Sequence, residues 1–459
     1  MRHFEMPGIS RVKSGRTFLL IWLLIATVYG VWLLTFWPGI LGEDSLAVLL
    51  EIESNGSFQS GKTTLWYYFV KLFSGPAELV EIPISAQMLI ASVIFSRILT
   101  WCLSNQMKKI FFFCLIFICL APNMVFFIGL LYSDAIFSVC VIGLLFEIWL
   151  IANRRKISPT SLAIIFIALP FAGFARSNGV VFVLALLPLL IILKRPDGLK
   201  LAAVIGAWCL AVFAGNQFHK TYKHGVLYPL ALFETVNFLQ PRPMGLWVAS
   251  PRVSDRTIRI LTQKQPLSKI LEYYDPDYWD PLIYRDDGPQ LLALPIRQQK
   301  RIVKEFFRYN LWQNIPDFFG SRVNIFLVSS LAGGGFPGLE YSSHVLKRTH
   351  SQSEFRKMEM ERIEPFFRAL HEFSFTFRWI LWTPWLGIGL TGWLLLAGWQ
   401  RRDVSILLVT VPMAALLGGI FFFSIAGEYR YLLPYFVLPL VLLPVLATLR
   451  RQARSNAVK

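Results

Sequence analysis

The sequence predicts an all-α protein that crosses a membrane about ten times and exports one large loop region with mixed and helical character. Three observations lead to this fold class. The chain has 459 residues, of which 55% are hydrophobic, and a mean hydropathy of +0.52, which is more apolar than a soluble domain. Apolar stretches of ~20 residues, long enough to cross a bilayer, recur along the chain. Lys and Arg gather at alternate ends of these stretches.

The apolar runs place ten candidate spans. The first covers residues 17–37 and is too long, and too poor in a small-residue cleavage site, to be a removed signal peptide. We therefore expect it to stay as a membrane anchor. The other spans are predicted at 82–103, 110–127, 132–152, 160–175, 179–193, 201–218, 379–399, 404–425 and 432–449.

The basic residues orient these spans. Ten crossings put both termini on one side, and the segments on that side hold Arg2, Arg11, Lys13, Arg16, Lys108, Lys109, Arg154, Arg155, Lys156, Lys194, Arg195, Lys200, Arg401, Arg402, Arg450, Arg451, Arg454 and Lys459. The short segments on the other side hold only Lys62, Lys71, Arg176 and Arg430. Since cytoplasmic loops are enriched in Lys and Arg, we expect both termini in the cytoplasm.

Three regions follow from this topology. Residues 1–218 form a bundle of spans one to seven, residues 219–378 form an exported soluble region, and residues 379–459 form spans eight to ten. Within the exported region, Asp-Pro pairs predict turns over 269–287, and 297–319 is expected to be an amphipathic helix. The run 324–332 is too short to cross a bilayer, so it is expected to dip into the interface or to pack on the bundle.

Composition also bears on partners and metals. The net charge of +17 comes from basic residues beside apolar segments, which argues against nucleic acid as a partner. Neither the cysteines nor the histidines have metal-site spacing, although an oxygen-ligated divalent cation between acids and a phosphate stays open. These residues are Cys102, Cys114, Cys119, Cys140, Cys209, His219, His224, His344, His350 and His371.

Acidic residues mark the exported side of the bundle. Glu43 and Asp44 follow the first span, and Asp134 begins the fourth span on the same side. A partly desolvated carboxylate gains proton affinity and can act as a general base for a sugar hydroxyl. The alternative for Asp44 is a solvated loop acid or a helix N-cap, and the alternative for Asp134 is a cap of the fourth helix.

Two arginines lie on the same side. Arg176 and Asn178 belong to the tight turn between spans five and six, while Glu428, Arg430 and Tyr431 join spans nine and ten. Guanidinium groups beside acids suit a phosphate, whereas the alternative is interfacial snorkelling with carboxylate pairing.

Residues 56–63, GSFQSGKT, match the phosphate-loop pattern of nucleotide-binding proteins. That loop must join a buried strand to a helix, whereas this match lies in an exported loop where ATP is absent. We therefore expect no ATP as a partner, but keep Lys62 as a donor to a different phosphate.

The order of these motifs resembles that of the integral-membrane GT-C glycosyltransferases, in particular bacterial members. The pattern P-G-x-x-x-x-D-S after span one is matched by Pro38, Gly39, Asp44 and Ser45. An acid before span four is matched by Asp134, and an R-x-N-G turn by Arg176, Asn178 and Gly179. The resemblance covers residues 30–190 and the turn 428–434. In two departures, Ser133 replaces the Lys that commonly precedes the second acid, and Gly61-Lys62-Thr63 replaces a His-Pro.

The resemblance implies an activity as well as a fold. Such enzymes transfer a hexose or pentose, with inversion, from a polyprenyl-phosphate donor to a cell-envelope glycan or lipid acceptor on the outer face of the bacterial inner membrane. By matching position, the resemblance implies that Asp44 is the general base or the acid that organises it, and that Asp134 is a second acid in the site. Lys62, Arg176, Asn178 and Arg430 hold the leaving phosphate, which Tyr431 orients, and Glu43 and Glu428 lie beside them. No cofactor is certain.

Three other classes compete with this one. A flippase of lipid-linked sugars also needs cations at a bundle mouth, but transporters generally place polar groups near midplane, whereas these lie at the exported rim. An O-antigen polymerase or ligase shares the large late exported loop. For a non-catalytic assembly subunit the sequence supplies no positive feature.

Overall fold

The computed structural model describes residues 11–55, 57–219, 227–241 and 253–457, and this part of the chain is helical, with two isolated β-bridges and no strand. The chain forms two compact units. Unit 1 comprises residues 1–222, 336–416 and 432–459, and unit 2 comprises residues 223–335 and 417–431. Arg2, Gly56, His224 and Lys459, which entered the sequence predictions, lie outside the described residues.

Within the described residues, seven helical segments are long and apolar enough to cross a membrane. Each coincides with a predicted span, which is consistent with a multi-pass membrane protein. Five segments belong to single helices: Gly15–Thr35 of α1 (Arg11–Thr35), α4 (Glu81–Ser104), α7 (Ser133–Arg154), α10 (Arg195–Phe218) and α21 (Val404–Phe423). The other two contain several short helices. Arg378–Arg401 contains α19 (Arg378–Leu381) and α20 (Trp385–Arg401), and Tyr429–Arg454 contains η5 (Tyr429–Leu432), α22 (Leu433–Val437) and most of α23 (Pro439–Ala457).

The other three predicted spans differ from this pattern. The predicted span 110–127 forms two helices, α5 (Lys108–Leu120) and α6 (Pro122–Ile128), which meet at an angle of 60°. Pro122 has no N–H for the helix and disfavours helical geometry at the residue before it, so the helix breaks there. The segments at 160–175 and 179–193 form the shorter helices α8 (Pro159–Phe174) and α9 (Val180–Ile192), the second preceded by η1 (Ser177–Gly179). The count of ten crossings stays a prediction.

Helix α7 is the buried centre of unit 1. Of the residues in its most apolar window, 94% are buried inside the protein, and α4, α8 and α22 all pack against it. Glu147 of α7 is fully buried and accepts two hydrogen bonds from Arg97 of α4, at 2.7 Å from Nε and 3.3 Å from Nη2. The paired charges satisfy each other inside the bundle, where an isolated charge is costly.

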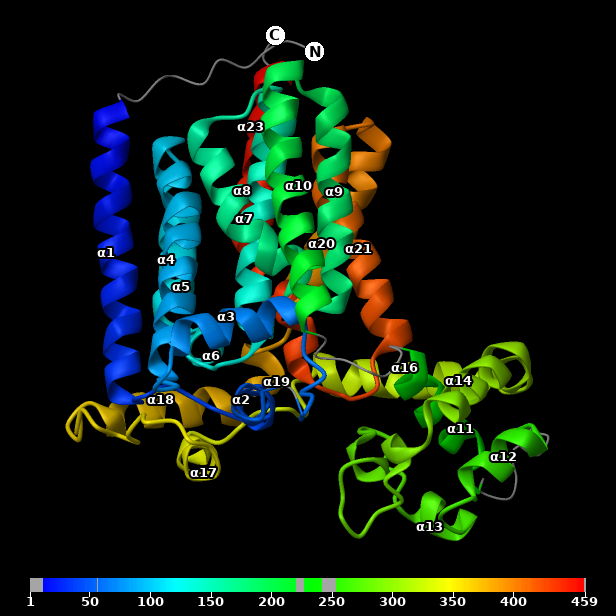
Figure 1. Cartoon of the computed structure of the whole chain (residues 1–459). Helices are drawn as coiled ribbons and strands as arrows, with labels where there is room; N and C mark the ends of the chain where they lie inside the picture. Colours follow the sequence, from blue (N-terminus) through cyan, green and yellow to red (C-terminus); the bar gives the residue numbers. More distant parts are fainter. Residues whose placement is uncertain (1–10, 56, 220–226, 242–252, 458–459) are drawn as a thin grey trace. The chain divides into compact units, whose positions relative to one another are not determined.

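Several short helices lie across one end of the unit 1 bundle. They are α2 (Glu43–Glu53), α3 (Thr64–Ser74), α6, α17 (Tyr341–Arg348) and α18 (Glu364–Thr376), and α1 begins and α23 ends at the opposite end (Figure 1). The first loop, like the region after residue 336, is therefore largely helical and belongs to the unit that contains the candidate spans.

Unit 2 packs around α11 (Leu227–Phe238). Phe233 and Phe238 of this helix share a buried core with Phe306, Phe318 and Ile325. The remaining elements are α12 (Asp255–Leu261), α13 (Leu267–Glu272), η2 (Asp280–Leu282), η3 (Leu291–Ala293), α14 (Ile296–Glu305), the π-helical η4 (Phe306–Asn310), α15 (Leu311–Gln313) and α16 (Ile315–Ser330).

The helix predicted over 297–319 is not one helix. Helix α14 passes through the π turn η4, and the chain breaks at Asn314, where φ is −132°, before Pro316 begins α16. The run 324–332 forms the second half of α16 and the turn after it, and its position in the membrane interface or on the bundle stays a prediction. Residues 269–287 contain mainly turns, as predicted, but they also include the end of α13 and η2.

Candidate functional site

The first loop of unit 1 lies along the segment that leads into α7. Ile40 N donates to Gly129 O at 2.9 Å, Leu131 N donates to Ile40 O at 3.0 Å, and Ser45 Oγ donates to Leu131 O at 3.0 Å. Gly39 has φ = +115°, a conformation that favours glycine, and follows a cis Trp37-Pro38 bond. These contacts place the start of α2, with Asp44, beside the start of α7, with Asp134.

Tyr132 lies where these two segments meet. Its hydroxyl accepts a hydrogen bond from Asp44 N at 3.5 Å. A Cβ at position 42 would overlap this hydroxyl, so any other residue at Gly42 would force the Tyr132 side chain to move. Tyr132 is therefore a site residue that the sequence predictions did not include, although it directly precedes the Ser133-Asp134 motif.

Asp44 forms an ion pair with Lys62. The distance from Lys62 Nζ to Asp44 Oδ2 is 2.6 Å, and the side chains are 24% and 20% exposed. The Asp44 carboxylate is thus paired but still within reach of solvent. The residue is in the first turn of α2, whose N-cap is Gly42, so Asp44 is not the capping residue.

Asp134 forms an ion pair with Arg176. Asp134 is only 2% exposed, whereas the Arg176 side chain is 21% exposed. Asp134 is in the first turn of α7, where the helix dipole favours a negative charge, but the N-cap position belongs to Tyr132. The buried acid therefore fixes an arginine whose head lies nearer the surface.

The Arg176 turn adjoins the Lys62 turn. Thr63 Oγ1 donates to Ala175 O at 3.1 Å, which joins the two turns directly. A Cβ at Gly179 would lie 2.5 Å from Ala172 O, so the glycine of the R-x-N-G pattern is required by packing. The Asn178 side-chain oxygen is buried and has no hydrogen-bond partner within the described part of the chain, which leaves an acceptor available at this turn.

A buried acid that the sequence predictions missed is connected to the Lys62 backbone through Ser60. Glu51 is fully buried, and its Oε2 accepts hydrogen bonds from Ser60 N, at 3.2 Å, and from Ser60 Oγ. Ser60 Oγ in turn accepts from Lys62 N at 3.2 Å. The other carboxylate oxygen lies 3.0 Å from His219 Nε2, and the His219 ring stacks on Tyr67 at 4.0 Å.

The predicted residue Glu43 has a different environment. It is exposed and accepts a hydrogen bond from the Tyr341 hydroxyl. Burial and the Glu43 carboxylate raise the pKa of Tyr341 to about 12. Ser342 Oγ accepts from Leu41 N at 2.9 Å and donates to Gly39 O at 3.0 Å, so the start of α17 is bound to the loop that carries Asp44.

Glu428, Arg430 and Tyr431 belong to unit 2, where the structure brings them together. Arg430 Nε donates to Glu428, and its guanidinium lies 5.7 Å from the Tyr431 ring centre. Gly427 N donates to Asp277 O at 2.7 Å, and Tyr429 N to Gly334 O at 3.3 Å, which binds this turn to the rest of the unit. The role of these three residues in one site with Asp44 stays a prediction.

The phosphate-loop match joins α2 to α3 and not a strand to a helix. Its last residue, Thr63, is the N-cap of α3 and accepts a hydrogen bond from Trp66 N. Among the described residues, no group of three or more His, Cys, Asp or Glu could hold a metal ion. The chemically useful feature of this segment is therefore the position of Lys62.

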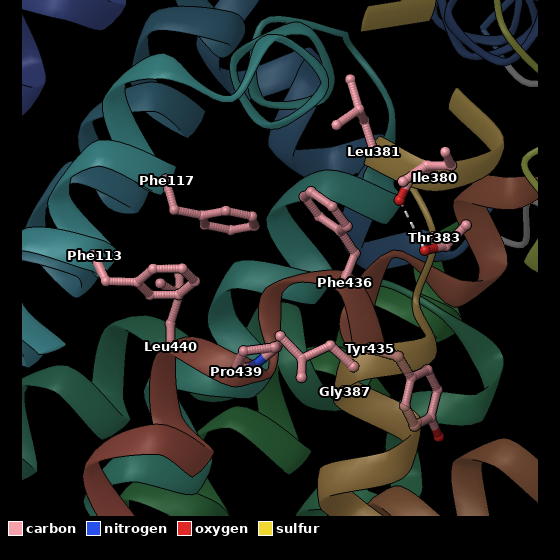
Figure 2. Close-up of a pocket in the computed structure, with 11 residues that line it drawn as sticks. Phe113, Phe117, Ile380, Leu381, Thr383, Gly387, Tyr435, Phe436, Pro439 and Leu440 are labelled. Atoms are coloured by element: carbon pink, nitrogen blue, oxygen red, sulfur yellow. Dashed lines mark hydrogen bonds between the residues drawn. The ribbon is translucent and has the colours of Figure 1, made fainter. Parts of the chain in front are cut away.

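An apolar cavity of about 190 Å³ lies elsewhere in unit 1 and contains none of the predicted site residues. Aromatic rings of Phe113, Phe117 and Phe436 face it (Figure 2). The Tyr435 hydroxyl donates to Met413 O at 2.5 Å. A cavity with this lining suits an apolar chain better than a phosphate or a sugar.

Comparison with known proteins assigns no family. No protein-family model matches the chain, and no curated protein and no solved structure is significantly similar to it. The resemblance to GT-C glycosyltransferases stays a prediction from short motifs. The function is therefore argued from the cluster of Asp44, Lys62, Asp134 and Arg176, which we call the acid–cation cluster.

Proposed function

We propose that the chain is an integral-membrane glycosyltransferase that moves a sugar from a polyprenyl-phosphate donor to an acceptor hydroxyl. The observation that carries the proposal is the acid–cation cluster, in which two acid–cation pairs from four separate segments meet at one end of the unit 1 bundle. Transfer of a sugar away from a phosphate needs a base for the attacking hydroxyl and cations for the departing anion, and the cluster contains both.

The two acids have different roles in this proposal. Asp44 is 20% exposed, so it can reach an acceptor hydroxyl and take its proton as the oxygen attacks the anomeric carbon. Asp134 is 2% exposed and bound to Arg176, so it positions that arginine. The bond between the anomeric carbon and the phosphate oxygen breaks, and the polyprenyl phosphate leaves with the bonding electrons.

The donor phosphate would also activate the base. Lys62 pairs with Asp44 when no anion is bound, and a phosphate that binds Lys62 and Arg176 competes for that ammonium group. Asp44 then loses its cationic partner and becomes a stronger base. Donor binding and base activation are coupled in this way.

The remaining predicted residues have supporting roles in the proposal. Within unit 1, Glu43 and Asn178 would orient the cations of the cluster or contact sugar hydroxyls. The acceptor is a cell-envelope glycan or lipid, and the proposed location is the exported face of a bacterial inner membrane. A divalent cation stays open as an additional contact to the phosphate.

Replacement of Asp44 by Asn tests the proposed base. The measurement is transfer of radiolabelled sugar from a polyprenyl-phosphate donor by purified protein in detergent. We expect Asp44→Asn to lower the rate at least a hundredfold, which is typical for loss of a general base, without unfolding the protein. The control is Glu53→Gln, which changes a second acid of α2 that pairs with the exposed His350. Unchanged turnover in Asp44→Asn would contradict the mechanism.

A second experiment separates the transferase from a flippase. Donor and acceptor are supplied together in micelles, where no translocation is needed for reaction. Product formed under these conditions supports the transferase. Absence of product from protein that moves lipid-linked sugar across vesicles would instead identify a flippase.

An O-antigen polymerase or ligase differs in its donor. It would transfer a preassembled oligosaccharide from a diphosphate-linked lipid, whereas the proposed enzyme uses a monophosphate-linked sugar. Offering both donors to the purified protein distinguishes the two classes by which one is consumed.

A further inference from the structure

Unit 2 has an exposed apolar face on α16. From Ile315 onward the apolar side chains of this face are spaced four residues apart, which places them along one side of the helix. Together with Trp312 of α15, they are between 39% and 63% exposed. We call this set the apolar stripe, which consists of Trp312, Ile315, Phe319, Val323, Leu327 and Leu331. Large apolar side chains that are exposed together along one helix face indicate an interaction site.

The apolar stripe is not an unfinished part of the core of unit 2. The opposite side of α16 already fills that core with Phe318 and Ile325. Between them, Arg322 is fully buried, donates to Glu234 and to Ser424 O, and lies 5.9 Å from the Phe233 ring centre. Helix α16 is therefore fixed by one face, and the apolar stripe remains for another partner.

The neighbouring part of α21 indicates which partner covers the apolar stripe. Helix α21 is one of the helices that could cross a membrane, and its last turns belong to unit 2. There Phe422 packs on Phe319 at 6.1 Å between ring centres, and Phe421 packs on Phe326 at 5.9 Å. Phe422 and Phe423 are themselves 40% and 53% exposed. The apolar surface of a candidate span thus continues onto α16.

The chain that leads into α16 is basic and aromatic. Helix α14 and η4 present exposed cations at spacings of three and four residues, which are Arg297, Lys300, Arg301, Lys304 and Arg308. Exposed Phe307, Tyr309 and Trp312 follow them. Aromatic and basic side chains beside an apolar helical face are typical of segments that lie in the headgroup layer of a bilayer with anionic lipids.

We propose that the apolar stripe lies in the interface of the membrane that α21 enters, and that the cations of α14 and η4 bind anionic lipid headgroups there. The inference does not depend on the proposed enzymatic activity. It assigns α16 to the bilayer surface, parallel to it, as an extension of the apolar end of α21.

Spin labels on the full chain in lipid nanodiscs test this assignment. Single labels at Phe319→Cys and Val323→Cys are compared with one at Asp255→Cys, an exposed position on α12 of the same unit. We expect the first two labels to collide at least several times more often with oxygen, which partitions into lipid, than with a nickel chelate, which stays in water. The label at position 255 should show the reverse.

Other occupants give different results. Labels at 319 and 323 that are accessible to the nickel chelate would overturn the proposal. Labels shielded from both reagents would indicate a protein partner, and a dipolar coupling between labels of two copies would indicate self-association. Either of these results also overturns the lipid assignment.

The anionic headgroups are tested separately with a label at Phe307→Cys. Its oxygen preference should rise when phosphatidylglycerol replaces part of the phosphatidylcholine, and this rise should disappear in Lys300→Glu/Lys304→Glu or at about 0.5 M salt, where charges are screened beyond a few ångströms. A rise that survives both changes would contradict the role of these cations.

Discussion

Asp44 and Asp134 each lie in the first turn of a helix, but we expect their substitution to have different effects because their surroundings differ. Asp134 is 2% exposed and holds Arg176, so Asp134→Asn leaves a cation without its buried partner. We expect a loss of about 2 kcal/mol in the free energy of unfolding, because a largely buried hydrogen bond between charged groups is lost. Asp44→Asn should cost at most about 1 kcal/mol, because its pair with Lys62 is partly exposed. Denaturation in detergent measures both.

A double substitution is the control for this argument. Asp134→Asn combined with Arg176→Gln removes both charges, so it should be less destabilising than Asp134→Asn alone. Equal destabilisation by Asp44→Asn and Asp134→Asn would contradict the assignment of separate roles.

Glu51 and His219 act on Lys62 through Ser60, so their substitution should affect donor affinity more than turnover. We expect Glu51→Gln or His219→Asn to raise the KM for the donor about tenfold, equivalent to about 1.4 kcal/mol, with a smaller change in kcat. Glu53→Gln again serves as the matched control, since Glu53 pairs with His350, whose side chain is 89% exposed. An equal fall in kcat with an unchanged KM would indicate a direct catalytic role instead.

At the scale of elements, the packing of α18 on α6 predicts a pH dependence of stability. His371 of α18 is 8% exposed and stacks on Phe126 of α6 at 4.8 Å. Burial, with the nearby Arg368, lowers the pKa of His371 from 6.5 to about 4. The unfolded chain therefore binds a proton more readily than the folded one between these values, and stability falls as pH drops from about 6.5 to 4, by up to about 3 kcal/mol.

His371→Phe keeps an aromatic ring against Phe126 but cannot take up a proton. The variant should lose the part of the acid sensitivity that His371 causes, as measured by thermal unfolding at a series of pH values. His350→Phe, at an exposed position, should retain the slope of the original protein. A slope unchanged in His371→Phe would show that other groups cause it.

The helices were predictable from the sequence where a local run of apolar residues is enough to define a helix. Each predicted span except 110–127 coincides with one apolar helix, because burial of backbone groups in hydrocarbon requires long apolar runs. The break at Asn314 was missed because the amphipathic period continues through this position. Local periodicity reports which faces are apolar, but not whether the helix axis stays straight.

The site residues were predictable from the sequence only where the charge of the residue type itself suggests a role. Asp44, Lys62, Asp134 and Arg176 were identified as charged groups on one side of the predicted membrane, and the structure places them in two pairs. Glu51 and His219 were not found, because their partnership depends on α10 returning to α2 across a long sequence separation. Tyr132 was missed because its contact with Gly42 is a matter of close packing and not of charge.

At the scale of the whole molecule, the number of crossings decides whether the acid–cation cluster faces the exported side. Helices α8 and α9 are shorter than the ~20 residues that span a bilayer. The segments on both sides of this helix pair are basic, with Arg154, Arg155 and Lys156 before it and Lys194 and Arg195 after it. If both helices cross, these two basic segments share the cytoplasmic side, and the Arg176 turn lies on the exported side.

Cysteine labelling in intact cells measures this arrangement directly. A membrane-impermeant maleimide should label Ser177→Cys, beside Arg176, without permeabilisation, whereas Lys156→Cys and Arg402→Cys should react only after the membrane is opened. Ser177, Lys156 and Arg402 are all exposed, so protein burial does not shield them. If positions 156 and 177 both reacted only after the membrane is opened, α8 would not cross. The acid–cation cluster would then face the cytoplasm or the bilayer, and an exported sugar acceptor would be ruled out.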